Sequence, residues 1–470
     1  MLRNLASQAA SFFSYDALKP SGRRKAPRRT VVREDHHVRG GKHRAIQENA
    51  SDLARNLSIA AWMVRRHLDY VASFDFHGRN ESEELNQRIE KLVAEDSRPS
   101  RTDVAGRFGR EKMFRIAEAR RVLDGDTALI KLDDGRFQGI QADLIRDPSD
   151  KQTSETWVNG VMIGRTGRPL SYGIHRRTSD TSVAFVRRVN APNLIHYGFF
   201  DRYAGDQVRG ISPLVSALNP LRDVYENFDY ALAKSKVSQL FALAFYRDAE
   251  DSAGTVEYEG DESETEAGDT NDKYSVDFGG GPALLDLEPG DRAEFLESRQ
   301  PSSEFQAFTQ LIIQCAIKAL DIPYSFYDES HTNFFGSRAA WLHYDRSCND
   351  KRADQIEMRR SYTVWKLATW IRDGRLILPR GWRVSDVAFE WVPKGLPWFD
   401  TAKEVRGNVA AVKGALDNPQ RICRATGTDL YDNIDQIAKA KEYAAKKGVS
   451  LEYVLDQAPQ IIVPDATDIE

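Results

Sequence analysis

The sequence predicts an α+β fold in which long helices dominate. Apolar residues recur every three or four positions in several stretches, most clearly over 211–247, and this is the spacing of one helix face. Between 126 and 163 the period falls to two, and Asp134-Gly135 and Asn159-Gly160 supply the residues that tight hairpin turns require. The chain has 470 residues, which is long enough for several structural parts.

Composition narrows the class of protein. Hydrophobic residues make up 41% and charged residues 29%, as in soluble folded proteins. The net charge of −4 means that any contact with nucleic acid must come from local patches. The three cysteines, Cys315, Cys348 and Cys423, form no CxxC pair, so we expect neither a zinc knuckle nor disulfides, and synthesis in a reducing cytoplasm fits. No apolar run reaches the ~18 residues of a membrane span, and we expect no signal peptide.

The first 48 residues are interpreted as a basic N-terminal arm. Residues 19–44 contain ten Lys/Arg and only two acidic residues. Such a segment is either a solvated tail or an arm that binds a neighbouring subunit or DNA phosphates, and both alternatives stay open. An α+β part is expected to follow over 49–210. Its predicted elements are helices near 49–68, 81–94 and 109–123 and strands over 126–132, 136–145 and 156–163.

Residues 211–247 are predicted to form one long helix. Ser212 can cap it, and Pro213 suits the first turn. A helix of this length would span roughly 50 Å, which is typical of a stalk that packs against neighbours. Pro220 lies inside the pattern, so a kink or a later start is an alternative. The apolar positions are Leu214, Leu218, Leu221, Tyr225, Phe228 and Leu232.

An acidic insertion is expected over 248–301. Its first part, 248–272, holds eleven Asp/Glu and no Lys or Arg, which is typical of a solvated loop. Short strands are predicted over 273–300. A second helix is then predicted over 302–320, with Phe305, Phe308 and Ile312 on one face.

An aromatic loop is predicted over 321–336, ahead of a long, charged helix from Ser337 to Arg372. Helical spacing resumes from 399 to 470. We see no motif for catalysis: GxxxxGK(S/T), HExxH, GxSxG and GxGxxG are all absent from the sequence. The nine histidines show no ligand spacing, and the acids of 257–266 do not match a calcium loop. We therefore predict no catalytic residue, no metal and no cofactor.

The order of these parts resembles that of the portal proteins of tailed bacteriophages. In that family two stem helices flank a clip, a tunnel loop follows, and a long helix leads to a helical crown. Four short stretches look like the lambda-type branch, and the resemblance covers roughly residues 50 to 450. The stretches are Asn159-Gly160-Val161 with Gly167-Arg168-Pro169-Leu170-Ser171-Tyr172; Asn193-Leu194-Ile195-His196; Asp206-Gln207-Val208-Arg209-Gly210-Ile211-Ser212-Pro213-Leu214; and Leu320-Asp321-Ile322-Pro323-Tyr324 followed by Ser337-Arg338-Ala339-Ala340.

The resemblance implies a homo-oligomeric ring, usually a dodecamer, at one capsid vertex of the virion. Double-stranded DNA would be driven through it by the terminase large subunit docked at the clip. Head–tail adaptor proteins and the major capsid protein or scaffold would be further partners, with assembly in the host cytoplasm and no membrane. The implied parts are a wing over 49–210, stem helices over 211–247 and 302–320, a clip over 248–301, a tunnel loop over 321–336, a long helix returning to the wing over 337–398 and a crown over 399–470.

The resemblance also assigns roles to side chains. The predicted DNA-channel residues of the tunnel loop are Tyr324, Tyr327, His331, Asn333, Phe334 and Phe335, although these aromatics would equally suit a subunit interface. The predicted stem and interface residues are Leu218, Leu221, Tyr225, Phe228, Phe305, Phe308, Ile312 and Arg338. The predicted acidic clip residues are Glu257, Glu259, Asp261, Glu262, Glu264 and Glu266, either lining the channel or facing solvent.

Two other classes of function compete with this one. A head–tail adaptor or minor capsid protein is the first, but such chains are usually shorter and lack the stem–clip–stem order. A metal-dependent nuclease is the second, and it would need carboxylates that converge on a divalent cation. The acids here form one run of low complexity, which argues against a nuclease.

Overall fold

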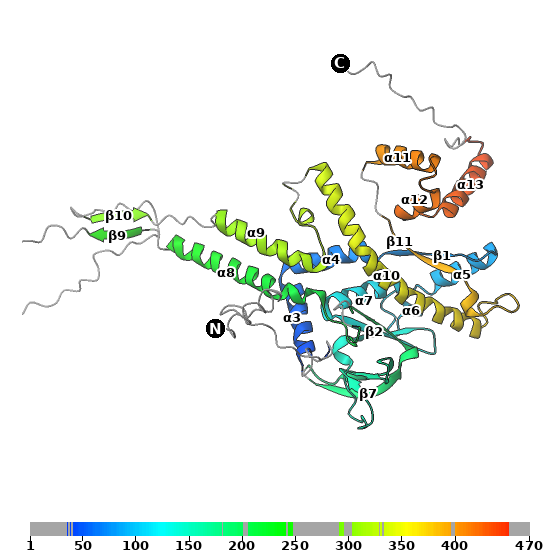
Figure 1. The fold of residues 1–470 in the computed structure, drawn as a ribbon, viewed down its shortest axis with the longest axis horizontal. Helices are drawn as coiled ribbons and strands as arrows, with labels where there is room; N and C mark the ends of the chain where they lie inside the picture. Colours follow the sequence, from blue (N-terminus) through cyan, green and yellow to red (C-terminus); the bar gives the residue numbers. More distant parts are fainter. Residues whose placement is uncertain are drawn as a thin grey trace, which may run out of the picture. The chain divides into compact units, whose positions relative to one another are not determined.

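The computed structural model describes residues 35, 38, 41–180, 182–200, 205–240, 243–247, 291–295, 303–328, 330, 333–395 and 400–450. These fall into two units: residues 219–316 form one, and the rest of the chain forms the other (Figure 1). Helices and sheets both occur, so the fold is of the mixed class that the sequence predicts. Across the described ranges, no helix is both long and apolar enough to cross a lipid bilayer.

Five helices precede the sheets of the larger unit. They are α3 (Lys42–Asn56), α4 (Ser58–Val71), α5 (Glu83–Glu95), α6 (Pro99–Thr102) and α7 (Arg110–Asp124). The single helix predicted over 49–68 is wrong, because the backbone at Leu57 is extended and separates α3 from α4. The Ser82 hydroxyl accepts from Leu85 N and so fixes the start of α5. Gly125, with φ of 91°, ends α7.

Two antiparallel sheets follow. One has the order β3-β2-β8 and the other β4-β5-β6-β7. The strands are β2 (Asp126–Lys131), β3 (Phe137–Gln141), β4 (Trp157–Val158), β5 (Val161–Ile163), β6 (Pro169–Arg177), β7 (Val183–Asn190) and β8 (Leu194–Gly198), with short 3-10 turns η2 (Ala142–Leu144) and η3 (Ala191–Asn193). The predicted hairpin turn at Asn159-Gly160 is confirmed, with φ of 47° and 90°. The strand predicted over 136–145 is shorter, because η2 replaces its second half.

Alternation along β2 gives the larger unit its layers. Ala128 and Ile130 face the core shared with the four-stranded sheet. Leu129 faces the opposite way and packs with Phe114 of α7 and Tyr362 of α10. The sheet β3-β2-β8 therefore lies between the second sheet and the helices α7 and α10, and it is buried on both faces.

Helix α10 (Phe334–Arg372) is the longest described element, with 39 residues. It starts at Phe334 because the Asn333 side chain accepts from Gly336 N at 2.6 Å, so the predicted start at Ser337 is three residues late. After it, β11 (Phe389–Pro393) returns and pairs with β1 (Phe74–Gly78). A third core of α5, β1, β11 and the end of α10 is built around the fully buried Trp370.

Three helices close the described chain: α11 (Thr401–Lys413), α12 (Pro419–Ala425) and α13 (Leu430–Lys446). They approach the end of β11 at two glycines. A Cβ atom on Gly395 would lie 1.9 Å from the Thr426 carbonyl carbon, so a side chain there would clash with the turn that joins α12 to α13.

The smaller unit holds most of α8 (Leu218–Leu240), β9 (Leu243–Arg247), β10 (Asp291–Phe295) and most of α9 (Ser303–Ile317). The helix predicted over 211–247 is therefore wrong at both ends. Residues Pro213–Ser216 form a 3-10 turn, η4, which Ser212 caps, and α8 begins at Leu218 with Pro220 in its first turn. At the other end the chain leaves the helix because Leu243–Arg247 pairs antiparallel with Asp291–Phe295.

Candidate functional site

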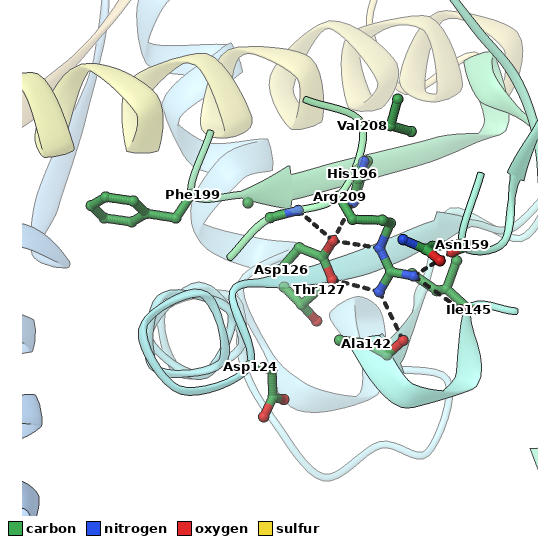
Figure 2. A network of polar contacts seen from close by, with 12 residues as sticks. Asp124, Asp126, Thr127, Ala142, Ile145, Asn159, His196, Phe199, Val208 and Arg209 are labelled. Atoms are coloured by element: carbon green, nitrogen blue, oxygen red, sulfur yellow. Dashed lines mark hydrogen bonds and ion pairs between the residues drawn. The ribbon is translucent and has the colours of Figure 1, made fainter. Parts of the chain in front are cut away.

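The segment that leads into α8 is anchored by a fully buried arginine. The Arg209 guanidinium has five N–H donors, and all five find an acceptor (Figure 2). Its Nε and Nη2 atoms bind the two oxygens of Asp126 at 2.6 and 2.8 Å. The remaining acceptors are the carbonyl oxygens of Ile145 at 3.0 Å, Asn159 at 2.6 Å and Ala142 at 2.9 Å.

Backbone contacts complete this anchor. Gly210 N donates to Asp126 Oδ2 at 2.9 Å, and the Gly210 carbonyl lies 2.7 Å from His43 Nε2. Gly210 must be glycine, since a Cβ atom would lie 2.1 Å from the Gly125 oxygen. The Asp35 carboxylate accepts from the backbone N–H groups of Val208 and Arg209.

Electrostatics show how firmly the pair is held. Burial alone would favour the neutral acid, but the neighbouring Arg209 charge outweighs it and holds the pKa of Asp126 well below its usual value. A buried pair with every donor and acceptor used stabilises one geometry and leaves no group for chemistry. We therefore assign Arg209 and Asp126 a structural role, which is to fix β2, η2 and the β4–β5 turn around the segment 206–212.

A second buried cluster joins α4, α7, β8 and α10. The Glu118 carboxylate pairs with His67 Nε2 at 2.6 Å and accepts from Tyr197 Oη and Gln355 Nε2. Burial opposes ionisation of Glu118, yet Arg121 and His67 lower its pKa to about 2. The His67 and Glu118 side chains are 0% exposed, so the pair contacts no substrate. No group of three side chains suited to a metal ion occurs among the residues the structure describes.

The first half of the predicted tunnel loop is packed onto two helices. Phe326 stacks on Tyr70 of α4 with ring centroids 5.8 Å apart and meets Tyr344 of α10 edge-on at 5.4 Å. Tyr327 contacts Trp62 at 5.9 Å and Tyr324 at 5.7 Å. Tyr324 is thus half-buried and Tyr327 is 41% exposed.

The second half of that loop is largely the first turn of α10. Asn333 is the N-cap, and Phe335 is 79% exposed, the most exposed of the predicted channel residues for which exposure is described. The side chain of Phe334 and the whole of His331 lie outside the described residues. Contact of these residues with DNA stays a prediction.

A groove of about 1270 Å³ lies beside this aromatic segment. Its apolar side comes from the loops after β8 and α9, and its charged side comes largely from α10. Lys351 of α10 holds the segment in place by donating to the Leu320 carbonyl at 3.2 Å and to Asp321 Oδ2 at 2.7 Å. The main lining residues are Phe199, Phe200, Ile211, Pro213, Tyr324, His343, Lys351 and Asp354.

The predicted stem residues are divided between buried and exposed positions. Leu221 is 1% exposed, Ile312 is half-buried, and Leu218 is the first residue of α8. Phe228 meets Phe305 across α8 and α9 with ring centroids 6.5 Å apart. Tyr225, Phe228 and Phe308 keep 44%, 44% and 56% of their surface exposed.

The charged face of α10 is used within the chain. Arg338 binds Glu404 of α11 at 3.0 Å, so the ion pair that the sequence analysis expected between subunits has a partner in the same chain. The fully buried Arg359 likewise pairs with Glu111 of α7 at 3.0 Å. A role for Arg338 between subunits stays a prediction.

The acidic clip residues lie outside the described part of the chain. They are Glu257, Glu259, Asp261, Glu262, Glu264 and Glu266, and residues 1–34 of the basic arm are likewise not described. Sequence reasoning missed the partners of Arg209, as well as Glu118 and Arg121. The available signal was an acidic residue inside an apolar strand, Asp126 before Thr-Ala-Leu-Ile, because a charge buried there requires a partner.

Comparisons with known proteins give one family match. The model of a family described as phage portal protein, lambda family, matches residues 21–352. Three similar solved structures are chains of gene transfer agent (GTA) particles, each 14% identical and covering 81% of this chain. They come from the virion of a native particle (TM-score 0.42, 93% of that chain), the neck of an empty particle computed with C6 symmetry (0.43, 94%) and the neck of a native particle computed with C12 symmetry (0.44, 93%). No curated protein sequence matches the chain.

Proposed function

The chain belongs to the lambda family of phage portal proteins, and we propose that it assembles into a ring that conducts double-stranded DNA at one vertex of the capsid. The family match over residues 21–352 carries this proposal, because it runs through the α+β part, α8, α9 and half of α10. In this proposal the ring serves genome packaging, head–tail joining and DNA ejection. Its partners are the terminase large subunit, a head–tail adaptor and the major capsid protein or scaffold.

The charge pattern supports a conduit that does not hold DNA tightly. A channel rich in Lys/Arg would bind phosphates strongly and stall their passage. The segment 248–272 instead carries eleven carboxylates and no basic residue. We propose that it lies at the end of the ring where the terminase docks, and that the ring's own role is structural rather than catalytic.

The exposed apolar residues of the smaller unit support assembly. Leu232 of α8 and Leu311 of α9 are each 55% exposed, in addition to Tyr225, Phe228 and Phe308. Apolar surface of this kind gains free energy when a second molecule covers it. We propose that α8 and α9 pack against the same helices of neighbouring copies in a closed ring.

Electron microscopy of the purified protein tests the proposal. We expect class averages of rings with a central channel and, for twelve copies of a 53.2 kDa chain, a particle mass of about 640 kDa. The variant Phe228→Asp places a charge in the exposed apolar surface of α8 and should yield monomers. Leu221 is unsuitable for this purpose, because a charge at so buried a position would disturb folding as well as assembly.

A matched control is Ile377→Asp, which changes an apolar residue that is 85% exposed in the larger unit. Rings from this variant, together with monomers from Phe228→Asp, would support the stem assignment. Rings from both would contradict it. Unaltered protein that stays monomeric even when produced with its capsid and scaffold proteins would contradict the conduit itself.

A further inference from the structure

A pocket lined by five arginines lies in the larger unit, away from the groove beside the aromatic segment. Its volume is about 430 Å³. Four separate parts of the chain supply the arginines, so the cluster is a product of tertiary structure. They are Arg44 and Arg55 of α3, Arg120 of α7, Arg146 after η2, and Arg177 at the end of β6.

Three of these arginines are already neutralised. Arg44 pairs with Glu48 at 2.8 Å, Arg120 with Asp124 at 3.3 Å and Arg177 with Asp143 at 2.9 Å. Asp180 is the fourth carboxylate that lines the pocket. The pocket thus combines directed donors with a charge of about one positive unit, five arginines against four acids.

The other two arginines have donors to spare. Arg146 uses its Nε to donate to the Asp143 carbonyl at 2.6 Å, and no carboxylate within 4.0 Å pairs with it in the described part of the chain. Arg55 reaches only Asp52, at 4.0 Å. Burial and the nearby charges of Arg44 and Arg177 lower the pKa of Arg146, which shows that its charge is incompletely compensated. An anion in the pocket would relieve this repulsion.

The sequence around the pocket indicates that the anion belongs to a polymer. The basic segment 19–44, with ten Lys/Arg, ends at Arg44 inside the pocket. Residues 160–198, which include Arg177, contain six arginines and a single carboxylate, Asp180. A free phosphate ion needs two or three donors, whereas basic stretches on both sides of a pocket match a chain of phosphates.

We propose that this pocket binds a backbone phosphate of duplex DNA through Arg55 and Arg146, at a site separate from any channel. The site is complete within one chain, so the proposal does not depend on ring formation. The surface would let the protein contact DNA that passes outside it. Contacts to phosphates carry no base information, so the binding should be independent of sequence.

Covalently closed circular duplex DNA is the probe of choice, because it cannot be threaded through a closed ring. Binding to the purified full-length chain is measured between 50 and 200 mM salt. The double variant Arg55→Gln/Arg146→Gln should weaken binding at least about tenfold at 0.1 M salt and reduce the slope of log K against log salt by about 2. The control Arg165→Gln/Arg168→Gln loses the same charge from exposed residues that do not line the pocket, and it should change affinity less than about twofold.

Each alternative has its own result. Equal losses in the pocket and control variants, or none in either, would overturn the proposal. Loss of inorganic phosphate binding with unchanged DNA binding would show a free-ion site, and loss of binding to a polyglutamate peptide alone would show a site for an acidic protein; both overturn it. If Arg146→Gln does not fold, Arg55→Glu at a residue 70% exposed gives the same test, with a larger expected loss of DNA binding.

Discussion

Two aspartates only two residues apart show how strongly a single side chain depends on its surroundings. Asp126 opens β2 and meets Arg209, and this pairing holds its pKa low. Asp124, the last residue of α7, lies apart from that network in Figure 2 and has only Arg120 at 3.3 Å as an ionic partner. Burial, which Arg120 only partly offsets, therefore raises the pKa of Asp124 to about 6.

This raised pKa has a consequence for stability. Asp124 binds its proton more tightly in the folded than in the unfolded chain, so its ionisation costs stability as pH rises from about 4 to about 6. We expect Asp124→Asn to raise the free energy of unfolding at pH 7.5 by about 1–3 kcal/mol and by about half as much at pH 5. Thermal denaturation at the two pH values measures this, and Asp180→Asn, at an exposed residue of the same pocket, is the control. A gain that grows toward acidic pH would contradict the assignment.

At the scale of elements, the C-terminal helices are attached to the β1–β11 pair by ions. Arg79, which follows β1, binds Asp429 at 2.5 Å and Glu390 of β11 at 3.2 Å. Arg424 of α12 binds the same Glu390 at 2.7 Å. Asp429 also caps α13 by accepting from Tyr431 N and Asp432 N. One buried carboxylate therefore both starts a helix and fixes it to the sheet.

Removing Arg79 separates these two roles. We expect Arg79→Ala to speed amide hydrogen exchange at least about tenfold in residues 419–446, because the docking contacts are lost, while leaving α7 and β2 unchanged. Hydrogen exchange with mass spectrometry is the measurement. Arg421→Ala, which removes an exposed pair with Asp417 in the same helices, serves as the matched variant. Equal effects from both would show that the Arg79 cluster is not what attaches these helices.

At the scale of the whole molecule, the exposed aromatic at the start of α10 separates two accounts of the predicted tunnel loop. Tyr324 and Tyr327 already have aromatic partners within the chain, whereas Phe335 is 79% exposed. If Phe335 lines a channel, Phe335→Ala should leave rings intact and reduce the yield of DNA-filled particles. Electron microscopy of the rings and counts of filled and empty capsids measure the two effects. Loss of rings would place Phe335 between subunits instead.

How much of this was predictable varies by element. The helices predicted over 81–94 and 109–123 correspond to α5 and α7, and the Asn159-Gly160 turn lies where expected, because apolar spacing and turn residues act locally. The prediction was wrong at Leu243–Arg247, where pairing with a strand more than forty residues away overrides the helical spacing. It also missed the break at Leu57, which carries neither proline nor glycine to mark it.

The sequence by itself determined the order of the parts, the mixed helix and sheet class and the resemblance to portal proteins. These follow from periodicity and short motifs, which neighbouring residues carry together. Only the tertiary structure decided what the charged residues do: Arg209 binds Asp126 across 83 positions, Arg359 binds Glu111 across 248, and five arginines from four parts of the chain meet at one pocket. The physical reason is that a buried charge is stable only beside a partner, and folding brings that partner from a part of the chain that local patterns do not indicate.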